Sequence, residues 1–243
     1  MILVVGHRGA AGLEPENTLR GFARALELGV DAVELDVRMT RDGEAVVMHD
    51  ARVDRTTDGS GRVRKLSLER VRTLNAGQGE RVPTLAEILD LVGRRVEVLC
   101  ELKGAVKAPL VEEEALRVVA ASGCAPVVVF TAMRAERLER VRRLEPAARV
   151  EPLFRRRPDK SELGALLPLG CVRIGVRHDA VDASLVRAAG AMGLVVRAWN
   201  PDSPEEWQRL LDAGVAAIGT NRPDALIQWL RRTGRRPQRA VGC

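Results

Sequence analysis

The stretch VELDV, residues 33–37, places two acidic residues inside an apolar run that is typical of a buried β-strand. Glu34 and Asp36 are two positions apart, and because side chains alternate along an extended chain, both point to the same face. Two buried carboxylates repel each other and lose hydration unless a positive charge lies between them. The stretch therefore predicts a strand whose acidic face meets a cation.

Seven further apolar runs of strand length alternate with amphipathic helical stretches along the 243 residues. The eight predicted strands cover residues 2–6, 32–37, 96–102, 127–130, 149–154, 172–176, 194–199 and 216–220. The predicted helices cover residues 16–29, 84–93, 109–123, 134–146, 182–193, 203–214 and 222–234. Near-continuous Val, Ile and Leu runs favour parallel strands. This alternation predicts an α/β fold, a (β/α)8 TIM barrel over residues 1–243, and a doubly wound sheet is the alternative.

One segment interrupts the alternation after the second strand. The turn RDGE, residues 41–44, leads into a further strand, AVVMHD, residues 45–50. Residues 51–82 then carry turn signals and one short helical pattern, residues 67–74. We interpret residues 51–82 as a small insertion between the second strand and its helix, and residues 231–243 as a solvated basic tail.

The composition limits the partners. A net charge of +6 suits an anionic substrate or a nucleic acid. Three Phe, three Trp and no Tyr leave no platform on which bases could stack, so we expect no nucleic-acid partner. No apolar stretch approaches the length of a membrane span, and the N-terminal MILVVG is too short for a signal peptide, so we expect a cytoplasmic protein. Nothing in the sequence indicates whether the protein is a monomer or an oligomer.

The four cysteines show neither zinc-like nor redox spacing. We therefore interpret Cys100, Cys124 and Cys171 as packing residues in or near the core.

Residues with acid–base or ligand chemistry gather at the ends of the predicted strands, where the active sites of such barrels lie. The strand ends carry His7 with Arg8, Glu34 with Asp36, His49 with Asp50, Glu101 with Lys103, and Trp199 with Asn200. Alone, Glu34 with Asp36 is more typical of an ordinary salt-bridged strand end. His7 with Arg8 alone could be a packed histidine beside a surface arginine, and His49 with Asp50 alone indicates little. Their coincidence favours an active site.

The residue types indicate the chemistry. Glu34, Asp36 and Glu101 are hard oxygen donors that suit Mg²⁺, Ca²⁺ or Mn²⁺ and do not suit Zn²⁺. Two histidines beside an ion can act as general acid and base, and Arg8 and Lys103 can hold a phosphate. Together these groups predict metal-assisted cleavage of a phosphate ester.

Several motifs in the same order resemble the glycerophosphodiester phosphodiesterase family. They are HRG, PENT, GVDAVELDVRMTRDGEAVVMHD, VPTLAEIL, ELK, RAWN and GTNRP, and the resemblance runs from Gly6 to about Pro223. It implies a TIM barrel in which residues 51–82 correspond to a short form of the family's insertion. It further implies hydrolysis of a small glycerophosphodiester, such as glycerophosphocholine or glycerophosphoethanolamine, to glycerol 3-phosphate and an alcohol.

The resemblance also implies roles for single residues. The metal ligands would be Glu34, Asp36 and Glu101, and the ion would be Mg²⁺ or Ca²⁺. The acid–base pair would be His7 and His49. Arg8 and Lys103 would bind the phosphate, and Trp199 would lie near the glycerol. Asn17, in PENT, is expected to cap the first helix and orient the HRG loop.

Alternatives remain at this point. A lysophospholipase D-like enzyme would act on lipid substrates, and a non-catalytic barrel would only bind phosphate or nucleic acid. Within the favoured reaction, attack by the neighbouring glycerol hydroxyl would give a cyclic phosphate, whereas attack by water would not.

Overall fold

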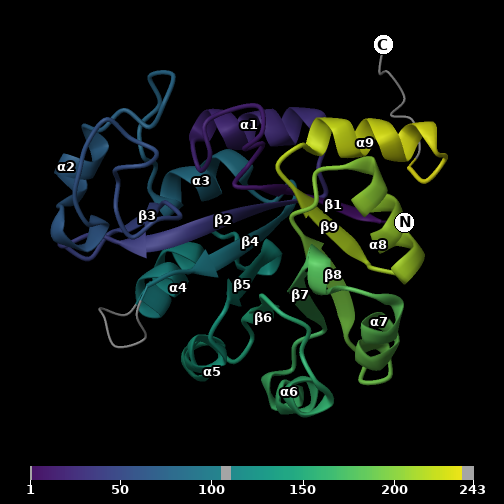
Figure 1. The fold of residues 1–243 in the computed structure, drawn as a ribbon. Helices are drawn as coiled ribbons and strands as arrows, with labels where there is room; N and C mark the ends of the chain where they lie inside the picture. The colour runs from purple at the N-terminus through teal and green to yellow at the C-terminus, as the bar shows by residue number, and fades with distance from the viewer. Residues whose placement is uncertain (1, 105–110, 237–243) are drawn as a thin grey trace.

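The computed structural model describes residues 2–104 and 111–236. Within them, eight parallel strands close into a barrel, because β1 pairs with both β2 and β9. The strands are β1 (Leu3–His7), β2 (Ala32–Met39), β4 (Glu97–Leu102), β5 (Val128–Ala132), β6 (Arg149–Phe154), β7 (Arg173–Arg177), β8 (Val195–Trp199) and β9 (Ala217–Thr220). Helices surround the strands (Figure 1). The predicted TIM barrel is confirmed.

The helices follow the predicted segments with one addition. They are α1 (Leu19–Leu28), α3 (Leu85–Val92), α4 (Val111–Ala121), α5 (Ala135–Leu144), α6 (Lys160–Ala165), α7 (Ala183–Gly190), α8 (Pro204–Ala213) and α9 (Pro223–Arg232). The helix predicted over residues 109–123 begins in a segment outside the described residues. Helix α6 was not predicted, because its six residues are too few to show a helical period.

The cap of α1 differs from the prediction. Thr18, and not Asn17, is the N-cap residue, because its hydroxyl accepts a hydrogen bond from the Gly21 amide at 3.1 Å. Asn17 has a positive φ of 59° and turns its side chain towards β2 instead. The expected capping role of Asn17 is therefore wrong, and this residue belongs to the site described below.

The insertion lies beside the barrel, next to β2 and α3 (Figure 1). Its first element, β3 (Ala45–Val47), pairs antiparallel with β2 beyond the barrel wall. Two short helices follow, η1 (Val63–Lys65) and α2 (Leu68–Arg72). A separate small core holds this part of the chain together: Val46, Met48, Val53, Val63, Val71, Leu74, Ala76 and Val82. The extra strand is shorter than predicted, and His49 follows it in a bend.

Other predictions concern single residues. Cys100 and Cys124 are buried and Cys171 is half-buried, as expected, whereas Cys243 lies outside the described residues. The basic tail is described only to residue 236; residues 232–235 are exposed, as expected, whereas the Arg236 guanidinium contacts Asp31 at 2.6 Å. No described helix is long and apolar enough to cross a membrane. The cytoplasmic location stays a prediction.

The interior of the barrel is divided between apolar and charged side chains. Val5, Ala32, Leu99, Val129 and Ala217 form an apolar cluster on one side.

On the other side, the fully buried Glu151 of β6 accepts hydrogen bonds from the guanidinium groups of Arg173 and Arg197. A Cβ on Gly175 would lie 2.8 Å from a guanidinium nitrogen of Arg197, so this position has room only for glycine. The sequence of β7 therefore leaves space for the buried ion pairs of Glu151.

This buried ion cluster gives a stability test. Glu151→Gln leaves the buried Arg197 without its carboxylate, whereas Arg173 keeps Glu97 at 2.6 Å, so we expect the free energy of unfolding to fall by about 3 kcal/mol in urea denaturation. Glu27→Gln is the control, because the Glu27 side chain is 65% exposed and its pair with Arg24 should contribute about 0–1 kcal/mol. Equal losses in the two variants would contradict the assignment.

The same cluster predicts a pH dependence. Burial would raise the pKa of Glu151, but the charges of Arg197 and Arg173 outweigh burial and hold the pKa below its usual range. Ionised Glu151 therefore stabilises the fold above the ordinary carboxylate pKa, and this stabilisation is lost as the pH falls below it. The stability difference between the wild type and Glu151→Gln should shrink as the solution is acidified.

Candidate functional site

A pocket of about 270 Å³ opens at the C-terminal ends of the barrel strands. Its walls are His7, Arg8, Glu34, His49, Glu101, Lys103, Met133, Leu153, Arg155, Arg197, Trp199 and Asn200. Seven residues expected from the sequence to form the site are thus brought together from five regions of the chain. The other two lie behind the wall, Asp36 with no exposed surface and Asn17 hydrogen-bonded to it.

The three acidic residues form the centre of this site. Glu34 and Asp36 lie on one face of β2, and Glu101 of β4 is the direct neighbour of Asp36 in the parallel register. All three residues are buried, and one oxygen from each lies within 4.8 Å of the others. The alternation of side chains that the sequence predicted therefore holds, and β4 adds the third carboxylate.

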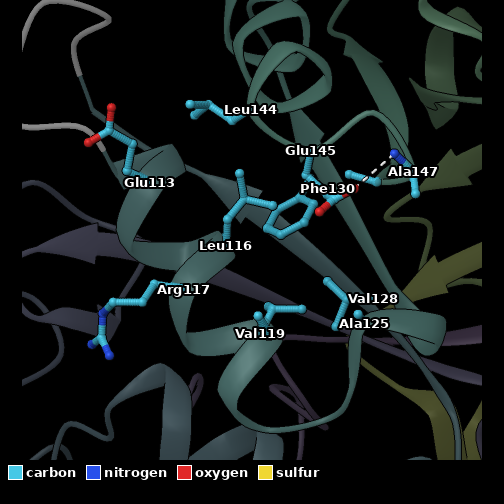
Figure 2. A pocket seen from close by; sticks show the side chains of 12 residues that line it. Glu113, Leu116, Arg117, Val119, Ala125, Val128, Phe130, Leu144, Glu145 and Ala147 are labelled. Carbon is cyan, nitrogen blue, oxygen red and sulfur yellow. Dashed lines mark hydrogen bonds between the residues drawn. The ribbon is translucent and has the colours of Figure 1, made fainter.

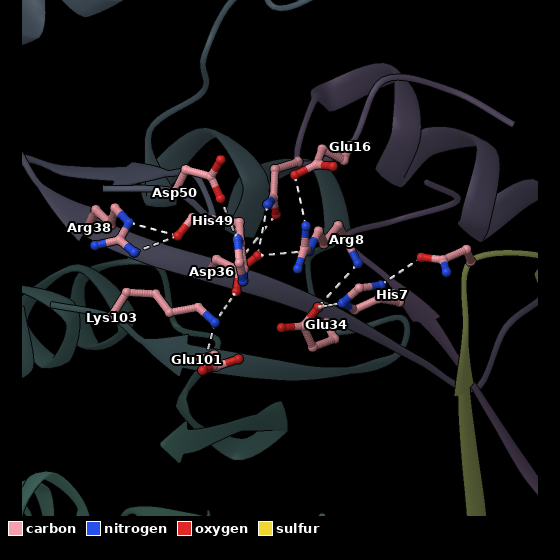
Figure 3. Close-up of polar contacts among 12 residues, drawn as sticks. His7, Arg8, Glu16, Glu34, Asp36, Arg38, His49, Asp50, Glu101 and Lys103 are labelled. Carbon is pink, nitrogen blue, oxygen red and sulfur yellow. Dashed lines mark hydrogen bonds and ion pairs between the residues drawn. The ribbon is translucent and has the colours of Figure 1, made fainter. Parts of the chain in front are cut away.

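Two cations and an amide surround Asp36 (Figure 3). The Lys103 ammonium lies 2.9 Å from Asp36 Oδ1 and 2.7 Å from Glu101 Oε1. The Nε atom of Arg8 lies 3.2 Å from Asp36 Oδ2, and Asn17 Nδ2 donates to the same oxygen at 2.9 Å. Both predicted phosphate-binding cations therefore reach the acidic cluster.

The electrostatics differ among the three acids. Burial and the charge of Asp36 raise the pKa of Glu34 to about 7. Burial also raises the pKa of Glu101. For Asp36 the effect of burial is outweighed by Lys103 and Arg8, and the pKa falls to about 2. Lys103 and Arg8 thus neutralise Asp36, whereas Glu34 is poorly compensated.

This donor set fits a divalent cation. Three carboxylates that converge without a cysteine or histidine among them are the ligands of Mg²⁺, Ca²⁺ or Mn²⁺. A cation also supplies the positive charge that burial and mutual repulsion demand at Glu34 and Glu101. The cluster could therefore hold a metal ion, as the sequence suggested.

The two histidines are each oriented by a partner. His7 Nδ1 lies 2.7 Å from Asn221 Oδ1, an acceptor, so this nitrogen carries the proton and Nε2 faces Glu34 at 3.8 Å. Burial and the charge of Arg8 lower the pKa of His7 to about 4. Neutral His7 can therefore accept a proton at Nε2.

His49 lies on the other side of Asp36 in Figure 3. Its Nδ1 is 2.7 Å from Asp50 Oδ1, and its carbonyl accepts two hydrogen bonds from Arg38 of β2. Burial lowers the pKa of His49, although Asp36 and Asp50 oppose this shift. Because β3 runs antiparallel to β2, the chain returns from the rim and brings His49 back beside the acids.

The insertion supports the site through Arg55, which sequence reasoning did not single out. Arg55 donates to both oxygens of Glu16, at 2.7 and 2.9 Å, and to Asp50 at 2.7 Å. Glu16 in turn accepts from Arg8 at 2.9 Å. A single guanidinium therefore connects the loops that carry Arg8 and His49. Little in the sequence indicated this role, because Arg55 lies among the turn residues of the insertion.

Asn221 was also missed as an individual residue, although its motif GTNRP resembles the family. Its amide group donates to Asp202 at 2.6 Å, which fixes its oxygen towards His7. The third histidine, His178, lies 2.9 Å from Glu206 and does not line the pocket.

A larger cavity of about 560 Å³ lies between α4 and α5, outside the barrel. Figure 2 shows Leu116, Val119, Val128 and Phe130 among its lining residues. Neither histidine and none of the three clustered acids lines it, so the chemistry belongs to the smaller pocket.

Comparison with known proteins agrees with this geometry. The family model described as "Glycerophosphoryl diester phosphodiesterase family" matches residues 7–225. A glycerophosphodiester phosphodiesterase of Caldanaerobacter subterraneus subsp. tengcongensis is 33% identical, over 96% of this chain and 99% of its own. A glycerophosphodiester phosphodiesterase of Bacillus subtilis is 31% identical, over 92% of this chain and 84% of its own.

Solved structures give the same result. A crystal structure of a putative glycerophosphoryl diester phosphodiesterase from Silicibacter pomeroyi has a TM-score of 0.88 and 28% identity, covering 96% of this chain and 94% of its own. A phosphodiesterase of Oleispira antarctica, solved with the product sn-glycerol-3-phosphate, has a TM-score of 0.86 and 26% identity, covering 94% and 96%. With the match over residues 7–225, the chain belongs to the glycerophosphoryl diester phosphodiesterase family.

Proposed function

We propose that this protein hydrolyses glycerophosphodiesters to glycerol 3-phosphate and an alcohol, with residues 1–243 acting as one catalytic unit. The observation that carries this proposal is the buried cluster of Glu34, Asp36 and Glu101 beside two oriented histidines in one pocket. Family membership supports it, and the product bound to the Oleispira relative is the product of this reaction.

The three carboxylates would hold one divalent cation, Mg²⁺ or Ca²⁺, with Mn²⁺ also suitable. When bound, such an ion acts as a Lewis acid towards the phosphate and its reacting oxygens. Asn17 orients Asp36 through its amide.

Substrate binding is proposed for Arg8, Lys103 and Trp199. Arg8 and Lys103 carry the positive charges nearest to the acids, and guanidinium and ammonium groups bind phosphate oxygens well. Trp199 lines the pocket, and its buried Nε1 has no hydrogen-bond acceptor among the described residues. Because a buried donor seldom lacks an acceptor, we assign this nitrogen to an oxygen of the glycerol.

The histidines would transfer the protons. One imidazole accepts the proton of the glycerol hydroxyl as its oxygen attacks phosphorus, and the other donates a proton to the departing alcohol oxygen. The product of this step is a cyclic phosphate. Water then opens the ring with the roles of His7 and His49 exchanged, which restores both protonation states.

The distribution of apolar surface favours small substrates over lipids. Among the described residues, the exposed large apolar side chains are Leu3, Leu144, Leu167, Val172 and Val195. Leu3, Val172 and Val195 lie at or before the starts of their strands, at the opposite end of the barrel from the pocket. A lipid-active enzyme would need such side chains at the pocket rim.

The first test measures glycerol 3-phosphate release from glycerophosphocholine and glycerophosphoethanolamine. We expect release with Mg²⁺, Ca²⁺ or Mn²⁺ and none with EDTA. Glu34→Ala should abolish release, and His49→Ala should lower kcat by about 10²- to 10⁴-fold, the usual contribution of a general acid or base. His178→Ala is the matched histidine control and should keep wild-type activity. Metal-independent release, or equal losses in the two histidine variants, would contradict the proposal.

A substrate analogue distinguishes the two routes of attack. A diester that lacks the hydroxyl next to the phosphate cannot form the cyclic phosphate, so we expect it to bind as a competitive inhibitor and to resist hydrolysis. Turnover of this analogue at the rate of the parent diester would show that water attacks directly.

Arg55→Gln tests the contact between the insertion and the site. Because Arg55 holds Glu16 and Asp50, we expect kcat to fall by about 10- to 100-fold, with little change in KM or thermal stability. Arg55→Lys should recover activity only partly, since an ammonium cannot reproduce the forked contacts. Arg52→Gln, in the same insertion and paired with Asp54, is the control. Wild-type kcat in Arg55→Gln would refute the positioning role.

A further inference from the structure

The rim of the pocket carries one arginine that the proposed mechanism does not use. The stretch FRRRP, residues 154–158, begins with Phe154, the last residue of β6, and continues with three consecutive arginines. Arg156 contacts Glu162 at 2.8 Å, and Arg157 contacts Asp182 at 2.5 Å. Arg155 lines the pocket and has no carboxylate partner among the described residues. Of the three, the arginine that faces the pocket is the one left uncompensated.

The position of Arg155 separates it from the reacting groups. Three strands separate β6 from β1 in each direction around the eight-stranded barrel, so β6 and β1 lie opposite each other. Arg155 follows β6, whereas His7 ends β1 and Arg8 follows it. A group attached to a phosphate between the histidines and pointing across the mouth therefore approaches Arg155.

The charges of the site indicate what that group is. A divalent cation, Arg8 and Lys103 together carry one positive charge more than the three carboxylates neutralise. The phosphodiester anion cancels this remaining charge. Arg197 is already bound to Glu151. The charge of Arg155 is therefore left over, and the only acids in the pocket wall are Glu34 and Glu101. Among the described residues, no acid lies at the Arg155 side of the wall to attract a cationic alcohol such as choline.

We propose that Arg155 selects glycerophosphodiesters whose leaving alcohol carries a second anionic group, a carboxylate or a phosphate. The inference rests on the proposed hydrolysis and adds the class of alcohol. Arg155 forms a charge-assisted hydrogen bond to that anion in the bound substrate, and a guanidinium suits both carboxylate and phosphate geometry.

Glycerophosphoserine and glycerophosphoethanolamine provide the test, because they differ by one carboxylate. We expect the wild type to favour glycerophosphoserine in kcat/KM, and Arg155→Gln to lose about tenfold on this substrate alone. Arg155→Glu should reverse the preference. Arg156→Gln is the control, because this exposed neighbour is already paired with Glu162 and should leave the ratio unchanged. Glycerophosphoglycerol and its terminal phosphate monoester form a second pair that distinguishes phosphate from carboxylate.

A binding measurement separates the two possible failures. Calorimetry with phosphoserine and phosphoethanolamine measures the effect of the same carboxylate on binding affinity, without any turnover. We expect Arg155→Gln to weaken the binding of phosphoserine and to leave the binding of phosphoethanolamine unchanged. Absence of hydrolysis together with this pattern would support the anion site and remove the proposed reaction. Equal kcat/KM values for the serine and ethanolamine diesters in the wild type, or equal losses on both in Arg155→Gln, would overturn the inference.

Discussion

The buried carboxylate of Asp36 is the group on which the rest of the site depends. It has no exposed surface, yet it contacts Lys103 from β4, Arg8 from the loop after β1 and Asn17 from the loop before α1. Its backbone carbonyl also accepts from the Met48 amide, which fixes the return of the chain after β3. One residue thereby holds four segments together, and three of them carry a group proposed for binding or catalysis: Lys103, Arg8 and His49.

Much of this arrangement could be predicted because it depends on local periodicity. The two-residue spacing of Glu34 and Asp36 fixes their common face in any strand, and the same rule applies to Glu101 and Lys103. Once the strands are parallel and alternate with helices, their C-terminal ends must meet at one end of a barrel. The convergence of these residues therefore required no knowledge of long-range contacts.

The features that sequence reasoning missed depend on contacts between distant segments. Arg55 contacts Glu16 across 39 positions, and nothing in the local pattern distinguishes Arg55 from Arg52. Asn221 meets His7 across 214 positions because β9 and β1 are neighbours in the closed barrel. The cap of α1 was misjudged for a different reason: Asn17 and Thr18 both suit an N-cap, and the choice follows from the contact of Asn17 with Asp36.

The charged interior around Glu151 has a consequence for heat. Hydration of charged groups becomes less favourable as temperature rises, so the cost of keeping Glu151, Arg173 and Arg197 out of water decreases on warming. Apolar packing gains no comparable advantage. The part of the barrel formed by β6, β7 and β8 therefore becomes stronger, relative to the apolar cluster of Val5, Ala32, Leu99, Val129 and Ala217, as the solution warms. The pocket wall that carries Trp199 includes β8 and so shares this part of the barrel.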